Sequence, residues 1–212
     1  MNRSRIFLLW LALVVTLLFS SCDSPFGGRQ VVVVDALAAP DAPKPAGLSY
    51  RLVARKSTLA NTPAQIPVIK ACLDAALGGA GMFEAPADAP ADLFINLSYG
   101  TSTTPRVDPS ARETYVQLSV RTNPGRSIDQ PTGPEVWDVR VAVLGLSGRI
   151  ESAMPLLAYA AVSNLGADTK VETRVEIPRN SPAVAAVREA ALKRLEASAP
   201  SAAPSAPLTP VK

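Results

Sequence analysis

The sequence predicts an α+β fold: a single two-layer domain with a mostly antiparallel sheet of about six strands and about three helices packed on one face. Two observations support this class. Five segments alternate apolar and polar residues with period two, which is typical of antiparallel strands that bury one face and expose the other. Three further segments carry an apolar stripe at helical spacing, and such helices can cover the apolar face of a sheet. The expected element order is β-β-α-β-β-β-α-β-α.

The strands are predicted from this alternation. The alternating segments are residues 48–55, 92–99, 116–121, 137–143 and 170–177, and Phe94 interrupts the polar face of the second one. Val31–Val34 is a continuous apolar run, which indicates a more buried strand. Residues 36–47 are rich in Pro and Ala and predict an extended connection. We expect the strands 92–99, 114–121 and 135–144 to form an antiparallel meander.

The predicted helices are recognised from their ends as well as from their apolar stripes. The first covers about residues 63–77, the second about 153–165, and the third begins near residue 181. Their end signals, in chain order, are Thr62 and Gly78, then Gly166, then Ser181 followed by Pro182. In the third helix the residues expected to face the core are Val184, Val187, Ala191 and Leu195.

The N-terminal residues are typical of a secreted bacterial precursor. Arg3 and Arg5 precede an apolar run, Ile6–Phe19, that is broken only by Thr16. As a helix this run is about 21 Å long, too short to span a hydrocarbon core of about 30 Å and suited to the apolar part of a signal peptide. An uncleaved membrane anchor is the alternative.

The segment Phe19-Ser20-Ser21-Cys22 resembles the lipobox of bacterial lipoproteins. The resemblance implies cleavage between Ser21 and Cys22 and attachment of acyl chains such as palmitate to Cys22, which would anchor the protein in the lipid bilayer. The alternative is ordinary signal cleavage that leaves Cys22 as a free thiol. Asp23 resembles the inner-membrane retention signal of enteric bacteria, so it favours the inner membrane without excluding the outer one.

Four segments follow from these predictions. They are a signal peptide over residues 1–21, a tether over 22–30, a single α+β domain over 31–196, and a disordered Pro/Ala/Ser-rich tail over 197–212. The precursor has 21 basic and 18 acidic residues, and the leader removes Arg3 and Arg5, so the net charge of the remainder is about +1. This balance does not indicate a nucleic-acid partner.

The most restrictive feature of the composition is that the chain has no histidine. This excludes Ser-His-Asp and Cys-His nucleophile pairs, histidine general acid-base catalysis and zinc sites with histidine ligands. Carboxylate-pair or Ser-Lys chemistry remains open. The sequence indicates no catalytic residue, no metal ligand and no cofactor site.

Several residues that superficially suggest chemistry have simpler interpretations. Cys72 lies among apolar residues of the first helix and is expected to be a buried packing residue. Gly78, Gly79 and Gly81 follow a helix instead of preceding one, so they indicate a helix end and not a phosphate loop. Trp137 is expected to anchor the core, with a ligand platform as the alternative. The segment 145–148 is expected to be a tight turn, because it lacks the spacing of a nucleophile elbow.

Two connections of the predicted meander carry a candidate contact site. The connections 100–113 and 145–152 lie at the same end of the sheet, because successive turns of a meander alternate between its ends. They bring together Arg106, Arg112 and Arg149 with several Ser and Thr residues. We hypothesise a weak site for an anionic or polyhydroxylated envelope partner, such as a protein or a glycan. Two solvated loops are the alternative.

Taken together, several short motifs resemble those of an uncharacterised family of bacterial envelope lipoproteins, domain of unknown function 4136. The matching pieces, which span roughly residues 31–190, are Gly47-Leu48-Ser49-Tyr50, 91–100, Glu135-Val136-Trp137, Met154-Pro155-Leu156-Leu157 and 165–169. The resemblance implies a lipid-anchored α+β domain and supplies no catalytic residues.

The sequence therefore favours a non-enzymatic, membrane-anchored lipoprotein that faces the periplasm and acts as an interaction or structural module. A protein that binds a small apolar or glycan ligand between sheet and helices is the first alternative, and its mark would be a pocket of several hundred Å³. A carboxylate-dependent hydrolase is the second. Its mark would be two acids facing each other across a cleft, one of them with a raised pKa.

Overall fold

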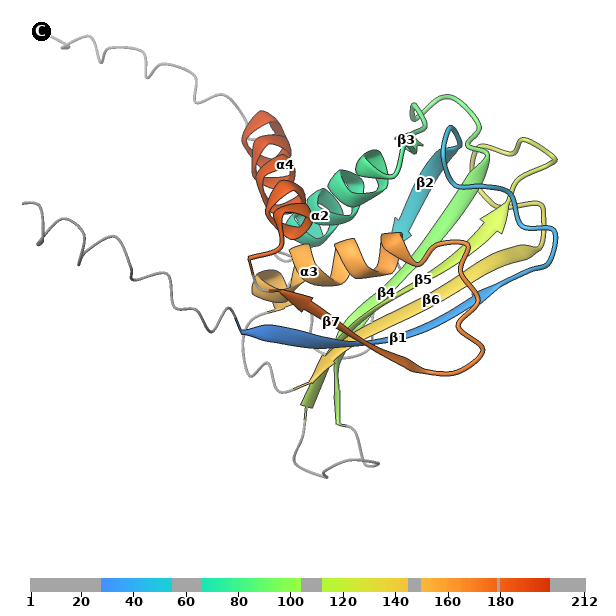
Figure 1. Ribbon diagram of the computed structural model, residues 1–212. Coiled ribbons are helices and arrows are strands. Elements are labelled where there is room, and N and C mark those ends of the chain that lie inside the picture. Colours follow the sequence, from blue (N-terminus) through green and yellow to red (C-terminus); the bar gives the residue numbers. More distant parts are fainter. Residues whose placement is uncertain (1–27, 55–65, 104–111, 145–149, 179, 199–212) are drawn as a thin grey trace, which may run out of the picture.

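The computed structural model describes residues 28–54, 66–103, 112–144, 150–178 and 180–198. Within these ranges a seven-stranded sheet carries three helices on one face, as Figure 1 shows. This confirms the α+β class, the single domain and the mostly antiparallel sheet. The strand count is seven instead of about six, because a two-residue strand, β3, follows the first helix.

The elements have the following bounds. The strands are β1 (Arg29–Ala38), β2 (Ser49–Ala54), β3 (Phe83–Glu84), β4 (Leu93–Thr103), β5 (Arg112–Thr122), β6 (Glu135–Leu144) and β7 (Thr173–Pro178). The helices are α2 (Ile66–Gly79), α3 (Ile150–Ser163) and α4 (Pro182–Ser198).

The strands lie in the order β3-β2-β4-β5-β6-β1-β7. β4, β5 and β6 form the predicted antiparallel meander, and β1 pairs antiparallel with both β6 and β7. β2 is parallel to β3 and to β4. The parallel pairs arise because α2 lies between β2 and the strands that follow it, and a helical crossover returns the chain in the same direction.

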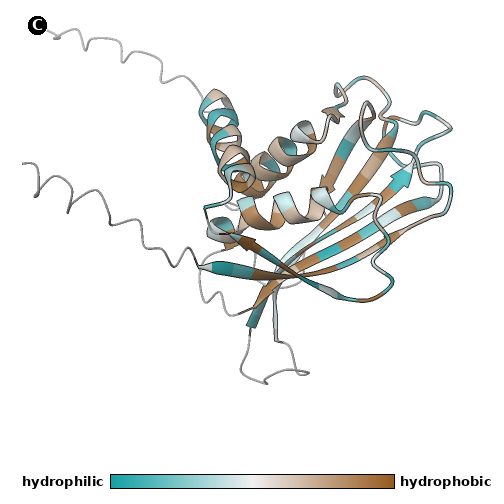
Figure 2. Ribbon diagram, in the orientation of Figure 1, coloured by the Kyte–Doolittle hydropathy of each residue, from teal (hydrophilic) through white to brown (hydrophobic). Residues whose placement is uncertain are grey.

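The core lies between the inner face of the sheet and the helices. Alternation in the central strands sends every second residue inward, as the colours along the strands in Figure 2 show. Val116, Leu118 and Val120 of β5 are fully buried, and so are Val139 and Val141 of β6. These buried residues belong to one continuous apolar cluster with α2 and α3.

The helices confirm the predicted stripes and shift some of their boundaries. α3 packs on β1, β5 and β6, whereas α4 packs mainly on α2 and α3. α3 begins at Ile150, three residues before the predicted start, and α2 ends at Gly79. Residues 62–65, which include the predicted cap and start of the first helix, lie outside the described residues. In α4, Val184, Val187 and Ala191 are buried as expected, and Leu195 is partly buried.

Two boundaries of the predicted segments differ from those in the structure. β1 extends to Ala38, into the segment 36–47 that was expected to be a connection. α4 extends to Ser198, two residues into the predicted tail, and residues 199–212 lie outside the described residues. The leader and most of the tether, residues 1–27, also lie outside them.

The burial of β1 and β7 departs from the prediction. In β1, Val32 and Val34 are buried, but Val31 is 40% exposed, so this strand buries one face only. In β7 the expected inward residues Thr173 and Val175 are exposed and only Ile177 is buried. The reason is position: β7 is the last strand of the sheet, and the helix layer is centred over β1, β5 and β6.

The structure explains why an apolar residue, Phe94, interrupts the polar face of its strand. It lies on the outer face of β4 and yet is only 1% exposed. Its neighbour on β2, Arg51, donates hydrogen bonds to the carbonyls of Pro86, Ala89 and Ile128, at 2.8, 2.7 and 3.0 Å. The segments that follow β3 and β5 therefore fold over this end of the outer face, which shields Phe94.

Candidate functional site

Most of the residues singled out by sequence as functional lie outside the described part of the chain. This applies to Ser21, Cys22, Arg106 and Arg149. Arg112 is described: it is the exposed first residue of β5 and pairs with Thr103, the last residue of β4. The ends of β4 and β6 both meet the start of β5, so the strand ends gather as the predicted meander requires.

A polar cluster that the sequence analysis missed lies beside Arg112 on the outer face of the sheet. Glu113 accepts hydrogen bonds from Ser102 at 2.5 Å and from the guanidinium of Arg140. Arg140 also stacks over the ring of Tyr115, with its guanidinium carbon 4.8 Å from the ring centre. Burial alone would raise the pKa of Glu113, but these hydrogen bonds and the Arg140 charge hold it below its ordinary value.

A second group of carboxylates lies on the same face. Burial raises the pKa of Asp138, and the neighbouring charges of Glu135 and Asp35 add to the effect, although two hydrogen bonds from Gln117 oppose it. These acids come from β6 and β1, but they stand side by side on the outer face of the sheet. They do not face each other across a cleft, which is the arrangement that a carboxylate-dependent hydrolase requires.

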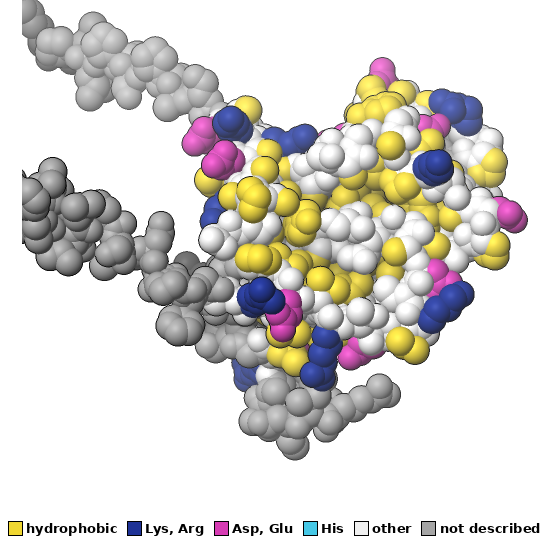
Figure 3. All heavy atoms as spheres, in the orientation of Figure 1, with side chains coloured by type: hydrophobic (Ala, Val, Ile, Leu, Met, Phe, Trp, Pro, Cys, Tyr) yellow, Lys and Arg dark blue, Asp and Glu magenta, His cyan; other side chains and the backbone are white. Residues whose placement is uncertain are grey.

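A large cavity lies among the three helices, and we call it the helix groove. Its volume is about 620 Å³. Its walls are mostly small residues, whose side chains leave the space between the helices unfilled; they include Ala75, Gly78, Gly79, Ala183, Ala186 and Ala190. Figure 3 shows apolar side chains exposed along the helices on this side of the molecule. This groove lies between helices, whereas the ligand pocket considered from the sequence lies between sheet and helices.

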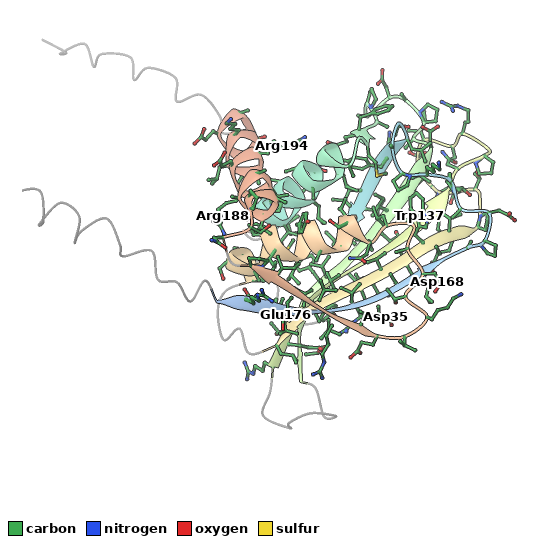
Figure 4. All side chains as sticks on the ribbon, viewed as in Figure 1. Asp35, Trp137, Asp168, Glu176, Arg188 and Arg194 are labelled. Atoms are coloured by element: carbon green, nitrogen blue, oxygen red, sulfur yellow. The ribbon has the colours of Figure 1, made fainter. Side chains whose placement is uncertain are left out.

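Three polar side chains border the helix groove: Tyr159, Ser163 and Arg194. Arg194 comes from α4, where Figure 4 labels it, and reaches the end of α2, because a Cβ placed on Gly78 would lie 3.5 Å from its Nη2 atom. An apolar groove with a cation at one end can accept a ligand that has an apolar body and an anionic head.

Arg194 also lines a neighbouring cavity of about 380 Å³, which borders a polar network centred on Asp74. Asp74 of α2, buried at the centre, accepts hydrogen bonds from Tyr50 Oη at 2.9 Å and from Lys70 Nζ at 2.6 Å. Lys70 also donates to Glu84 at 2.7 Å. Burial, followed by the Asp74 charge, raises the pKa of Tyr50, whereas the pKa of Lys70 is raised by its hydrogen bonds although burial opposes this.

The carboxylates of this network are bound by other side chains of the same network. Asp74 and Glu84 come from separate elements, but both are bound to the same ammonium group of Lys70. A buried carboxylate needs such partners to remain charged. The geometry therefore supports a structural network that joins α2, β2 and β3.

The remaining predictions about single residues agree with the structure. Cys72 is 3% exposed within the core, and burial raises the pKa of its thiol to about 11, which makes it unreactive at neutral pH. Trp137 is 1% exposed and belongs to the core. Gly78 and Gly79 end α2, and Gly81 lies in the turn after it. The segment 145–148 lies outside the described residues.

Across the described ranges, no cluster of Asp, Glu or Cys residues has the arrangement needed to hold a metal ion. None of the helices in the described part of the chain is both long enough and apolar enough to cross a membrane.

Comparisons with known proteins identify no family. A scan against models of protein families and a search of curated proteins both found no match. The resemblance to the lipoprotein family therefore stays a prediction.

Several solved structures match part of this chain at low identity. A PDZ domain protein from Parabacteroides distasonis is 12% identical over 70% of this chain, with a TM-score of 0.47, and the match spans only 38% of that protein. The PelC dodecamer from Paraburkholderia phytofirmans is 15% identical over 65% of this chain and 99% of its own, with a TM-score of 0.38. A candidate lipoprotein from Caulobacter crescentus is 18% identical over 71% of this chain and 93% of its own, with a TM-score of 0.24. These TM-scores are too low to transfer a function.

Proposed function

We propose that this protein is a non-enzymatic lipoprotein of the bacterial cell envelope, held by acylated Cys22 and facing the periplasm, where its domain contacts another envelope component. The observation that carries the proposal is the leader. Basic Arg3 and Arg5, an apolar run of 14 residues and two small residues before Cys22 occur in the order that lipoprotein processing needs.

The position of the first strand supports a location close to the membrane. β1 begins at Arg29, seven residues after Cys22. Even when fully extended, seven residues reach only about 25 Å. Two or three acyl chains on Cys22 give a firm anchor, since each buried methylene contributes roughly 0.8 kcal/mol. The domain would therefore meet its partners near the bilayer surface.

The chemistry of the chain supports a role without catalysis. The chain has no histidine, and the thiol of Cys72 is buried. The best-formed carboxylate cluster, around Asp74, is neutralised by Lys70. A general acid or base needs a suitable pKa at a site that substrate can reach. Cys72 is out of reach of substrate, and Lys70 has a raised pKa, so it stays protonated and cannot act as a general base near neutral pH.

The test of the anchor is replacement of Cys22 by Ser in the full chain, produced in bacteria supplied with labelled palmitate. We expect the variant to lose the label and to accumulate as uncleaved precursor. Cys72→Ala is the matched control, because it removes the other cysteine and should keep the label. Normal cleavage and membrane attachment of the Cys22→Ser protein would refute the lipoprotein proposal.

A second candidate function, binding of a small apolar ligand with an anionic head, is favoured by the helix groove. Its volume of about 620 Å³ lies within the range of about 300–1,000 Å³ that is usual for ligand sites. The apolar walls would take the body of the ligand, and Arg194 would take the head. A fluorescent fatty acid is a suitable probe of both parts.

This candidate is tested by filling the groove. Ala186 is exposed and lines it, so Ala186→Phe should occupy the groove without disturbing the core. We expect this change to weaken binding of the fluorescent fatty acid at least about tenfold. Glu189→Phe, an exposed change on α4 outside the lining, is the control for added surface hydrophobicity. Equal binding by both variants would exclude the groove as the site.

A further inference from the structure

β7 ends the sheet on one side, and its outer edge carries no strand among the described residues. Backbone groups alternate in direction along a strand, so half of those in β7 face away from β1. In β1, Ala36 accepts a hydrogen bond from Thr169, on the β7 side, whereas Ala39 donates to Val136, on the β6 side. The backbone N–H and C=O groups of the even-numbered residues of β1 therefore point toward β7.

The register of the β1–β7 pair extends this assignment to β7. Val32 and Val34 are paired with Val175 and Thr173, which must direct their backbone groups toward β1. The backbone N–H and C=O groups of Arg174 and Glu176 consequently point to the open edge. This is an unpaired strand edge of the kind that adds another strand.

The side chains of β7 divide between its two faces. Arg174 and Glu176 lie on the outer face, where Glu176 accepts a hydrogen bond from Arg29 at 2.9 Å; Figure 4 labels Glu176 beside the beginning of β1. On the helix side, Val175 is 37% exposed. Val175 and Ile177 also line a cavity of about 250 Å³ between β7 and α3. The edge thus combines an uncovered apolar side chain with two opposite charges.

We propose that β7 pairs antiparallel with β7 of a second copy of this chain, about a two-fold axis at Val175. In this register Arg174 lies opposite Glu176 of the second copy, and Glu176 lies opposite its Arg174. Both ion pairs join residues whose backbone groups face the open edge, so each pair also forms two backbone hydrogen bonds. Val175 of one copy meets Val175 of the other on the helix side.

The charges select this register over its neighbours. A two-fold axis at Arg174 would place Arg174 opposite Arg174 and Glu172 opposite Glu176, which pairs like charges throughout. An axis at Glu176 would place Glu176 opposite Glu176. Like charges directly opposite each other on a sheet are destabilising. The alternating charges along β7 therefore disfavour the two shifted registers and favour the register with its axis at Val175.

The C-terminal segment of the same chain is a poor occupant of this edge. Residues 199–212 contain Pro200, Pro204, Pro207 and Pro210. Proline has no N–H to donate to a ladder, and this spacing leaves no run of more than three residues that can donate continuously. A second copy, which offers a strand with complementary charge, fits better.

The pairing is tested by disulfide cross-linking of the full chain with Cys22 replaced by Ser. Val175→Cys places two thiols at a non-hydrogen-bonded pair, where Cα atoms lie about 4.5 Å apart, within the range for a disulfide. Thr173→Cys is the matched control, since Thr173 lies opposite Ile177 of the second copy and the two thiols would be about 13 Å apart along the strands. Both positions are exposed, and Cys72 is buried.

We expect mild oxidation to give at least about fivefold more covalent dimer with Val175→Cys than with Thr173→Cys. Adding Arg174→Glu to Val175→Cys should return the yield to that of the control. Adding Glu172→Arg should not do so, because Glu172 lies opposite Pro178 of the second copy. Thermal unfolding of each reduced variant establishes that all are folded.

The proposal is overturned if the two cysteine variants cross-link equally or if Arg174→Glu leaves the yield unchanged. Cross-linking of Val175→Cys to a different protein in whole cells, in place of the dimer, would assign the edge to that partner and also overturn the proposal. None of these outcomes depends on whether Cys22 is acylated.

Discussion

Trp137 is a core residue of the domain. It is the largest side chain that the described core encloses, and its Nε1 atom has no hydrogen-bond partner among the described residues. Its contribution is therefore packing. We expect Trp137→Ala to lower the free energy of unfolding by about 3–5 kcal/mol, because it removes apolar contacts and leaves a cavity.

Urea unfolding followed by circular dichroism measures this loss. Trp137→Phe is the matched control, because it keeps an aromatic ring and removes no hydrogen bond. It should lower the free energy of unfolding clearly less than Trp137→Ala does. If Trp137→Ala melts like the wild type but loses binding to an envelope partner, Trp137 is a ligand platform and the core assignment is wrong.

Single residues also show which features sequence can identify. Cys72 and Trp137 were placed in the core because their neighbours at helical or strand spacing are apolar. The cluster of Glu113 and Arg140 was missed, because each lies at an ordinary polar position of its own strand. Only the pairing of β5 with β6 brings the two together: Arg140 lies opposite Gln117, four residues from Glu113 on the same face of β5.

At the scale of elements, a short clamp holds the start of β2 against β4. Ser49 donates to Oδ2 of Asp92 from its backbone N–H at 2.9 Å and from Oγ at 2.6 Å, and Asp92 N–H donates back to Ser49 Oγ at 3.0 Å. The hydrogen bonds from Ser49 lower the pKa of Asp92. The clamp fixes the register of β2 against β4, one of the two parallel pairs that follow the crossover through α2.

This pKa shift makes a prediction about acid stability. A carboxyl group whose folded pKa lies below its unfolded value of about 3.9 stabilises the fold above that pH and loses the contribution as pH falls through the folded pKa. We therefore expect Asp92→Ala to be less stable than the wild type at neutral pH and the difference to shrink below about pH 4. Urea unfolding across this range measures it.

The control for this prediction is Asp88→Ala, which removes an exposed aspartate from the neighbouring loop. Its effect on the free energy of unfolding should be small at every pH. A destabilisation by Asp92→Ala that is the same at pH 7 and at about pH 2.5 would show that the charge of Asp92 does not stabilise the clamp.

The elements also show why the burial of β7 is harder to predict from the sequence than the burial of β5. Both have alternating patterns, but alternation reveals only that a strand has two different faces. Whether a helix covers the apolar face depends on the place of the strand in the sheet. β5 lies in the middle beneath α3, whereas β7 lies at the edge, where Val175 remains exposed.

At the scale of the whole molecule, Cys72 offers a probe of global opening. It lies on α2 and is buried in the core, and burial raises the pKa of its thiol to about 11. A maleimide should therefore modify it only when the domain unfolds. In the Cys22→Ser chain we expect the labelling rate to follow the unfolded population as urea increases, measured by mass spectrometry.

Labelling of the fully unfolded chain in concentrated urea provides the reference rate. Labelling at that same rate in native buffer would mean that the helix layer opens freely, and that Cys72 is accessible without global unfolding. The result also bears on the helix groove, because such opening would make its volume an unsuitable guide to ligand size.

By itself the sequence determined the α+β class, the positions of most strands and helices, the packing roles of Cys72 and Trp137, and the prediction that Cys22 is a lipid anchor. These follow from local periodicity, end signals and the order of residues in the leader, which need no knowledge of distant contacts. The tertiary structure decided the strand order, the parallel placement of β2, the helix groove and the open edge of β7. Each of these depends on which elements become neighbours, and that choice is made by packing between segments far apart in the chain.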